Sequence, residues 1–556
     1  MAEHEKEIQQ WFAEHVTLDS EPYTLDLDQA RAASDLHQNT LVTARAGSGK
    51  TRVIVAKTAF LVAYQGIPLS QIAIFMFNRA AAAEVNQRIS TVKVDGHSLT
   101  EISHQNTVDV VQIASTFHKF ALDIVKQAQN SPQIISENDQ AALIQRALTQ
   151  AVAGQKISPQ AYQELLNIVK GFIARAGQKF PGKSSLPQLK QVVTETCKIL
   201  LEKSPRDEAI KQQIFYHQVA LKTYISYLDQ LQPPCIDFNL LMDQATRLLE
   251  RTSSDKRSEE SYLNIRALRY VMIDEYQDFS YLFYALTTAI RTLAPAVHLF
   301  AVGDDWQAIN RFAGSDVDYF INFPEYFPED CVNIPLATNY RSAKGIVEHA
   351  NRYMLGHYDA EALPARAHSK KKGKVKVVNP ARQKFDCQDI EEDSLGDGRF
   401  LQALATASSQ PIAKISSAAG KLLKQLYKIC KKHRHEQIML LHRHNFTSFR
   451  NLDLEQLQSA LRDLLLSEEI MSPDEFTQQV RSMTMHKSKG LESDVVILLE
   501  FNREIVQSHH PHATIFPIFG DTLEAELADQ QRLIYVALTR AKHQLYLLST
   551  DQEICL

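Results

Sequence analysis

The chain has 556 residues, of which 44% are hydrophobic and 22% are charged, the composition of a globular protein long enough for several domains. No apolar run approaches the roughly eighteen residues of a membrane span, so we expect no membrane contact. The formal net charge is −5. The whole chain therefore offers no electrostatic attraction for nucleic acid, and any site for a polyanion must be a local groove.

The N-terminal residues and the cysteines bear on the cellular compartment. Residues Met1–Glu7 are polar and acidic, unlike a secretory signal, so we expect a cytoplasmic protein. The cysteines lie far apart, with no C-x-x-C pair and no histidine cluster at zinc spacing. Buried or incidental thiols are the preferred interpretation, and metal ligands are the alternative. The six are Cys197, Cys235, Cys331, Cys387, Cys430 and Cys555.

A strand, a glycine-containing loop and a helix are predicted near the N-terminus. Residues 39–44 are β-branched and apolar, which predicts a buried strand, and Lys50–Leu61 have a helical pattern. Gly47 and Gly49 in the loop allow close approach of the backbone. In this order, the N–H groups of residues 47–51 surround a phosphate at a helix N-terminus, whose dipole favours anions.

This loop predicts an ATP site. Lys50 would reach the β- and γ-phosphates, and the Thr51 hydroxyl would hold Mg²⁺. Ala44 occupies the first position of the usual G-x-x-x-x-G-K-[ST] pattern, so the alternative is a Gly-Ser turn that precedes Lys-Thr by chance. The residues that we expect to line the phosphates are Ala44, Arg45, Ala46, Gly47, Ser48, Gly49, Lys50 and Thr51.

A second signal lies much further along the chain, where the apolar run Tyr270–Ile273 ends in two adjacent carboxylates. At the end of a strand, Asp274 can bind Mg²⁺ through water, and Glu275 can polarise the attacking water. The alternative is a pair of solvated turn residues. Together with the phosphate loop, the two carboxylates predict a nucleotide hydrolase.

Further segments resemble, in order and spacing, the motifs of superfamily 1 helicases of the UvrD, Rep and PcrA group. Ala80 stands where that group usually has lysine. The run from Ala301 to Phe312 is most similar to the helicase IV branch. The matching segments are Leu25–Gln29, Phe77–Glu84, Thr116–His118, Asp237–Leu241, Gly303–Asn310, Asn339–Ser342, Thr484–Glu492 and Tyr535–Ala541.

The resemblance implies four more contacts with the nucleotide. Gln29 would read adenine, and Tyr340 would stack on it. Arg52 would lie near the nucleotide, and Glu492 would contact the ribose.

Three further residues would act at the γ-phosphate. Gln307 would sense it, while Arg341 and Arg540 would point at it from a second motor domain. The negative charge of the transition state calls for fixed cations, and such arginines are worth about 10³–10⁵ in rate. A surface ion pair is the alternative for each arginine. ATP between the domains would pull them together, and hydrolysis would let them part.

The resemblance also implies a track for single-stranded nucleic acid, read without sequence preference. Phe77 and Phe312 would stack on bases, each contact being worth about 1–3 kcal/mol. The alternative is that both phenylalanines are core residues. The residues expected to contact the DNA backbone are Thr116, His118, Thr484 and His486.

Some features of the family are missing or altered. Only residues 444–482 separate the strand-like Ile438–Arg443 from motif V (Thr484–Glu492), where the full-length helicases carry a large insertion called 2B. The sequence ends at Leu556, so we do not expect the further hairpin that the family normally carries after motif VI (Tyr535–Ala541). Motif VI begins Asp529-Gln-Gln-Arg532 instead of with an acidic pair and two arginines. ATP turnover is expected, whereas these departures disfavour efficient strand separation.

The motifs predict an α/β fold of two RecA-like P-loop NTPase domains, with parallel sheets flanked by helices and a helical insertion in the first. Residues 22–118 and 262–335 would form the first RecA-like domain and bind ATP, after a helical segment at 1–21. Residues 119–261 would form the insertion. Residues 336–556 would form the second RecA-like domain.

The leading hypothesis is an ATP-dependent, 3′→5′ translocase or helicase that uses Mg²⁺ and acts on single-stranded or partly duplex DNA. The alternative is a nucleotide-gated DNA-sensing ATPase subunit that works with a separate nuclease or repair protein, as in bacterial anti-phage defence. The missing 2B insertion favours this alternative. A scaffold with a dead site would require the loss of Lys50, Asp274, Glu275 or the arginines, and all are present.

Overall fold

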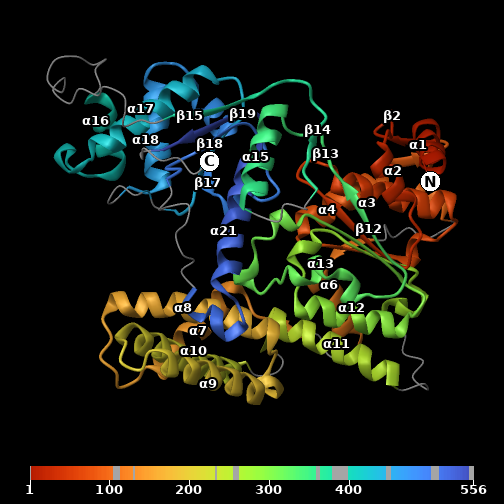
Figure 1. Ribbon diagram of the computed structural model, residues 1–556, viewed down its shortest axis with the longest axis horizontal. Helices are drawn as coiled ribbons and strands as arrows, with labels where there is room; N and C mark the ends of the chain where they lie inside the picture. The colour runs from red at the N-terminus through yellow and green to blue at the C-terminus, as the bar shows by residue number, and fades with distance from the viewer. Residues whose placement is uncertain are drawn as a thin grey trace. The chain divides into compact units, whose positions relative to one another are not determined.

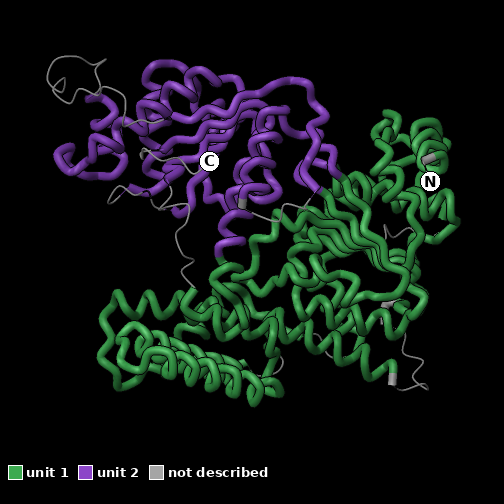
Figure 2. Tube along the Cα trace, in the orientation of Figure 1, with its two compact units in different colours: residues 1–44, 49–336, 509–526 green, residues 45–48, 337–508, 527–556 purple. Residues whose placement is uncertain are grey.

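The computed structural model describes residues 2–103, 113–128, 132–231, 235–254, 262–357, 363–378, 398–445, 447, 452–502 and 513–549. The chain divides into two compact units, which Figure 2 shows in different colours. Unit 1 comprises residues 1–44, 49–336 and 509–526, and unit 2 comprises residues 45–48, 337–508 and 527–556. No helix in the described ranges is long and apolar enough to cross a membrane.

A parallel sheet forms the centre of unit 1. Within its described residues, six strands lie in the order β12-β3-β11-β10-β4-β7. They are rich in Val, Ile, Leu and Phe, as expected for strands buried on both faces. They are β3 (Asn39–Ala44), β4 (Ile72–Met76), β7 (Ala114–Thr116), β10 (Tyr270–Ile273), β11 (His298–Gly303) and β12 (Cys331–Leu336). The strand predicted at residues 39–44 is confirmed as β3.

Helices cover both faces of this sheet, because alternate side chains of a strand point to opposite faces. Ile74 and Met272 enter one core, while their neighbours Phe75 and Val271 enter another. Figure 1 shows α3 and α4 on the first face and α6, α11 and α12 on the second. Their bounds are Lys50–Ala59 for α3, Arg79–Thr91 for α4, Phe117–Ala128 for α6, Phe238–Ser254 for α11 and Tyr281–Leu293 for α12.

Two smaller parts of unit 1 flank the first face. The N-terminal helix α1 (Ala2–His15) places Phe12 in the core on that face, and α2 (Leu27–Ser34) lies against α1 and α3. A small antiparallel sheet pairs β1 (Val16–Leu18) with β2 (Glu21–Pro22) and with β5 (Val92–Val94), which also pairs with β6 (His97–Ser98).

A helical layer with its own apolar core forms the rest of unit 1. It contains α7 (Glu137–Ala151), α8 (Pro159–Lys179), α9 (Leu186–Lys203) and α10 (Glu208–Gln230). The insertion predicted at residues 119–261 is narrower in the structure. Ile124 of α6 and Leu241 of α11 lie in the core of the sheet, so these two helices belong to the RecA-like fold.

A late segment of the chain also belongs to unit 1. Residues 509–526 group with it, and they include η11 (Ala513–Phe519) and the start of α21 (Leu523–Leu538). Ile515 and Phe519 of η11 are buried in the core of the helical layer. This placement differs from the predicted second domain, residues 336–556, because the apolar side chains of η11 are buried among α8, α9 and α10.

Unit 2 has a second parallel sheet, so the predicted fold of two RecA-like domains is confirmed. Within its described residues, this sheet has five strands in the order β15-β19-β18-β16-β17. They are β15 (Lys374–Val378), β16 (Ile438–His442), β17 (Val480–Thr484), β18 (Ser493–Leu498) and β19 (Ala541–Leu548). Helices α16 (Gly398–Ser408), α17 (Ser417–Lys432) and α18 (Leu454–Ser467) share a core with this sheet. Helix α15 (Lys344–His357) contacts β15 and β19.

Candidate nucleotide and nucleic-acid sites

Two glycines shape the loop between β3 and α3. Gly47 has a φ of +71° and Gly49 a φ of +86°, backbone conformations that favour glycine. A Cβ atom on Gly49 would also lie 3.0 Å from Gln29 Nε2. Because Gly49 has no side chain to cap the first turn of α3, that turn offers its N–H groups to an anion. The buried residues of this loop are Ala44, Arg45, Ala46 and Ser48.

The order of the strands gathers the predicted catalytic residues of unit 1. β3, β11 and β10 are adjacent and parallel, so the loops that follow them meet at one edge of the sheet. Lys50 follows β3, Asp274 and Glu275 follow β10, and Asp304 follows β11. Residues from three distant segments of the sequence thus share one edge.

Lys50 and Glu275 bond directly at this edge. Lys50 Nζ donates a hydrogen bond to Glu275 Oε2 at 3.2 Å, and both side chains are largely buried. Burial alone would lower the pKa of Lys50, but the charges of Glu275, Asp304 and Asp274 outweigh it and raise that pKa. The lysine is therefore a fixed cation. Glu275 itself has a φ of +50°, a strained conformation for a residue with a side chain.

A glutamine links the two carboxylate loops. Gln277 Nε2 donates to Glu275 Oε2, and Gln277 Oε1 accepts the N–H of Asp304 at 2.9 Å. Asp304 in turn accepts from Gln307 Nε2 at 2.6 Å. A Cβ atom on Gly303 would lie 2.5 Å from Gln277 Oε1, so only glycine leaves room for this link. Glu275 and Gln307, predicted separately, are members of one buried network.

Asp274 has the features of a magnesium ligand. It is 8% exposed, and burial, followed by the charge of Glu275, raises its pKa to about 7. A buried carboxylate held beside another negative charge is stabilised by a cation. The Thr51 hydroxyl would add a second oxygen, and oxygen ligands are those that Mg²⁺ prefers. The two predicted ligands therefore fit Mg²⁺ by their chemistry.

Gln29 and Arg52 lie beside the loop. Gln29 is 2% exposed and forms a capping box with Asp26 at the start of α2, in which Gln29 Oε1 accepts the Asp26 N–H at 3.2 Å. Arg52 donates to the carbonyl oxygen of Thr24 at 2.6 Å, and its guanidinium lies 4.4 Å from the Tyr23 ring centre. The segment that carries the predicted adenine contact is thus fixed to α3.

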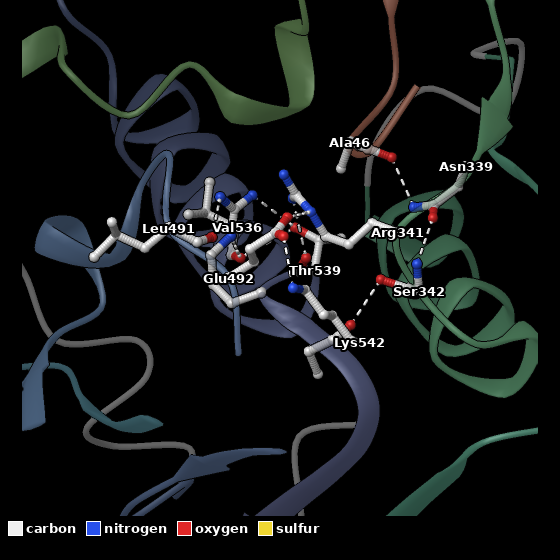
Figure 3. Close-up of polar contacts among 11 residues, drawn as sticks. Ala46, Asn339, Arg341, Ser342, Leu491, Glu492, Val536, Thr539 and Lys542 are labelled. Carbon is white, nitrogen blue, oxygen red and sulfur yellow. Dashed lines mark hydrogen bonds and ion pairs between the residues drawn. The ribbon is translucent and has the colours of Figure 1, made fainter. Parts of the chain in front are cut away.

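Arg341, in unit 2, is one half of an ion pair. Its Nε donates to Glu492 Oε2 at 2.7 Å, and Lys542 Nζ contacts the other carboxylate oxygen at 2.8 Å (Figure 3). Burial alone would raise the pKa of Glu492, but Lys542 and Arg341 outweigh it and lower that pKa. The side chain of Arg341 is 19% exposed, so it can be reached from solvent.

Arg540 is held in a different way. It is 1% exposed, and its Nε donates to the carbonyl oxygen of Val536 at 2.8 Å. One terminal nitrogen donates to Leu491 O at 3.1 Å and the other to Thr539 Oγ1 at 3.2 Å. These three bonds fix the orientation of the guanidinium.

Asn339 of unit 2 bonds to the middle of the phosphate loop. These loop residues, 45–48, group with unit 2. Asn339 Nδ2 donates to Ala46 O at 2.7 Å (Figure 3), and the next residue, Tyr340, donates its N–H to Gly47 O at 2.9 Å. The Tyr340 ring is 41% exposed, as a side chain predicted to stack on a base requires.

Three of the DNA contacts predicted in unit 1 lie beside the carboxylates. One cleft is lined by Phe77, Thr116, His118, Asp274 and Glu275. Phe77 is 48% exposed, although it follows a fully buried strand. The Thr116 hydroxyl accepts an N–H from the first turn of α6 at 3.2 Å. Burial lowers the pKa of His118 to about 4, so its imidazole is neutral and would contact a phosphate by hydrogen bonding alone.

The remaining predicted DNA contacts are partly buried. Phe312 lies in η7 (Arg311–Ala313) of unit 1. In unit 2, Thr484 ends β17, and His486 begins η10 (His486–Ser488). Burial, followed by the charge of Arg443, lowers the pKa of His486 to about 4. Both predicted histidine contacts are therefore uncharged at neutral pH.

Three residues that organise these sites were not among the predicted ones: Gln277, Asp304 and Asn339. Each lies within or next to a motif that was recognised, and this proximity was the available signal. Their roles depend on partners in other loops, Asp304 for Gln277 and Ala46 for Asn339, which sequence spacing does not reveal.

One strand ends in a phosphate loop, and another ends in adjacent carboxylates. Together with the two RecA-like sheets, these features define the class of P-loop NTPases built from two RecA-like domains. Within that class, the UvrD/REP helicase N-terminal domain model matches residues 25–328, and the UvrD-like helicase C-terminal domain model matches residues 402–552. The chain belongs to the UvrD-like helicase family.

Individual relatives agree with this assignment. DNA helicase IV of Escherichia coli is 26% identical over 547 residues, which cover 94% of this chain and 68% of that protein. The PcrA helicase of Staphylococcus epidermidis is 26% identical over 336 residues, 59% of this chain and 39% of the relative. The PcrA helicase of Bacillus subtilis is 27% identical over 316 residues, and the match spans only 36% of that helicase.

Proposed function

We propose that this chain is an ATP-dependent motor that moves 3′→5′ along single-stranded DNA and acts at junctions with duplex DNA. The observation that carries the proposal is the buried network from Lys50 through Glu275 and Gln277 to Asp304 and Gln307. It connects the phosphate loop to the two carboxylate loops. The polarity is inferred from the family.

The hydrolytic step follows from the pairing of Lys50 with Glu275. A nucleotide would draw Lys50 Nζ to its phosphate oxygens, because these carry more negative charge than one carboxylate. Glu275, still held by Gln277, would then accept a proton from the attacking water. Mg²⁺ held by Thr51 and Asp274 would neutralise charge on the phosphates. We assign Arg341 and Arg540 to the stabilisation of the transition state.

DNA binding is assigned to exposed aromatic and neutral polar side chains. Phe77 is the strongest candidate for base stacking, since nearly half of its surface is exposed beside the catalytic cleft. Because the pKa values of His118 and His486 are both about 4, their binding to DNA would not weaken between pH 6 and pH 8 through their own titration.

The test is the steady-state ATPase rate with and without an oligothymidylate. Turnover by the wild type should rise when the single strand is added, and Lys50→Ala should lower turnover by about a hundredfold or more. Lys198→Ala is the matched control, since Lys198 is an exposed lysine of α9, and it should leave both rates unchanged. A wild-type rate that ignores DNA, or a Lys50→Ala rate equal to that of the wild type, contradicts the proposal.

A further inference from the structure

The late segment of unit 1 is fixed to the helical layer by its backbone as well as by its apolar side chains. The carbonyl oxygen of Thr514 accepts from His217 Nε2 at 2.7 Å and from Gln213 Nε2 at 3.0 Å. The carbonyl oxygen of Phe519 accepts from Lys179 Nζ at 3.1 Å. These contacts hold the segment just before Asp521 against the helical layer.

Asp521 holds two arginines from different parts of unit 1. Arg175 of α8 bonds to one carboxylate oxygen, and Arg311 Nη1 lies 3.1 Å from the other. The side chain of Asp521 is 6% exposed, and those of Arg175 and Arg311 are 8% and 16% exposed. Loss of one partner of such a buried group leaves an uncompensated charge, so the three residues act as a unit.

Arg311 is the residue before Phe312, the predicted base-stacking residue. The loop is also fixed after Phe312. Gly314 has a φ of +98°, and a Cβ atom there would lie 2.5 Å from Gln178 Cγ of α8. The next residue, Ser315, forms an antiparallel bridge with Ser280. Asp521 is therefore the anchor of the first half of this loop.

Asp521 precedes the helix that leads to Arg540, one of the two arginines assigned to the transition state. Helix α21 begins at Leu523 and ends at Leu538, and Arg540 follows two residues later.

We propose that Asp521 is a positioning residue that holds Arg311, and through it Phe312, in the conformation that binds single-stranded DNA. This inference rests on the proposed function, because it assigns the control of DNA binding within it. The mutation Asp521→Asn tests it, since asparagine keeps the shape of the side chain and removes the charge that both arginines share.

The experiment measures four quantities in the full chain. The DNA concentration for half-maximal ATPase stimulation should rise by about tenfold, within the range expected when one stacking contact is lost. The ATPase rate without DNA and the KM for ATP should stay unchanged. A 2-aminopurine base in the oligonucleotide should lose its stacking-dependent quenching in Asp521→Asn at saturating DNA, as it should in Phe312→Ala.

Two further variants separate positioning from a general structural role. Arg311→Gln removes only the ion pair that links Asp521 to the loop of Phe312, and it should reproduce the DNA defect. The double variant Arg311→Gln/Asp521→Asn should be no worse than the more impaired single variant. Glu208→Gln breaks an exposed pair with Lys211 on α10 and should change nothing.

The outcomes distinguish this inference from the proposed function. If the wild type responds to DNA and Asp521→Asn has wild-type DNA affinity and quenching, the inference is wrong and the proposed function stands. If Asp521→Asn instead lowers the DNA-independent rate and the melting temperature while the quenching at saturating DNA persists, Asp521 is only structural, which also overturns the inference. A wild type that ignores DNA overturns both.

Discussion

The two parallel sheets have similar architecture but different chemistry at their strand ends. In unit 1, the loops after β3 and β10 bring Lys50 against Glu275, and Glu275 lines a cleft. In unit 2, β16 ends in His442, which is 1% exposed and lies 2.7 Å from the fully buried carboxylate of Glu500. The first pair includes a carboxylate that lines a cleft, whereas the second pair is closed off from solvent. The difference shows that activity resides in the loops and not in the fold.

A second contrast lies within unit 2, between the two candidate arginines. Arg341 is partly exposed and paired with a carboxylate, whereas Arg540 is almost fully buried and bonds to Val536 O and Thr539 Oγ1. Both are assigned to the same transition state. Because their environments differ, mutation of the two arginines should have different effects on the melting temperature of the protein.

Replacing either arginine by alanine should lower the ATPase kcat by about 10³–10⁵-fold, the largest effect that we expect. Arg341→Ala should leave the melting temperature nearly unchanged, because a partly exposed ion pair contributes only about 0–1 kcal/mol. Arg540→Ala should also lower the melting temperature, because it leaves a buried hole and the carbonyl oxygens of Val536 and Leu491 unsatisfied. Rate assays and thermal melts check both, with the surface variant Arg462→Gln as control. Equal melting temperatures for the two variants would remove the contrast.

Glu275→Gln should lower kcat by about 10²–10⁴-fold, since an amide cannot accept the proton of the attacking water. Binding of a fluorescent ATP analogue should be retained, because Lys50 no longer has a carboxylate that competes with phosphate. The exposed Glu325→Gln of α14 (Phe323–Tyr326) is the control in unit 1. Loss of nucleotide binding together with the rate would argue for a purely structural Glu275.

Gly303 tests whether the buried network of unit 1 is as tightly packed as the structure indicates, and Gly356 of unit 2 provides the control. Gly303→Ala brings a Cβ to 2.5 Å from Gln277 Oε1, so it should cost about 1–3 kcal/mol in the free energy of unfolding and slow ATP turnover. Gly356→Ala, in α15 of unit 2, meets no atom within 4 Å and should be neutral or stabilising by up to about 1 kcal/mol. Chemical denaturation measures both. A neutral Gly303→Ala would show that the link between the carboxylate loops is loose.

The smallest expected effect concerns pH. Asp274 has a pKa of about 7, so its carboxylate is mostly protonated at pH 6 and mostly ionised at pH 8. Only the ionised form can hold Mg²⁺. The Mg²⁺ concentration for half-maximal ATPase should therefore be about tenfold higher at pH 6 than at pH 8, and the pH dependence should vanish in Asp274→Asn. A Mg²⁺ requirement that is the same at both pH values would contradict the raised pKa.

Local sequence signals predicted the parts of these sites that depend on one segment. The β-branched run at residues 39–44 is a strand, and Gly49 has the φ that a phosphate loop needs. The helix that follows was less well predicted. It was expected to reach Leu61, but α3 ends at Ala59, and Phe60–Tyr64 form a π-helical turn in which the two end rings stack at 4.9 Å.

Features that depend on tertiary packing were not visible in the sequence. The periodic apolar pattern of α11 predicts a helix but not whether it packs on the sheet or within the helical layer. The short η11 has no pattern that would assign it to unit 1. The role of Asp521 depends on Arg175 and Arg311, which are far away in the chain, so no spacing rule indicates it.

Directional movement tests the central claim most directly. A motor that moves 3′→5′ should displace streptavidin from a 5′-biotinylated oligonucleotide in an ATP-dependent reaction, and much more slowly from the 3′-biotinylated one. Lys50→Ala should displace streptavidin from neither end. Displacement only from the 3′ end, or none by a wild type that hydrolyses ATP, would contradict the proposed 3′→5′ motor.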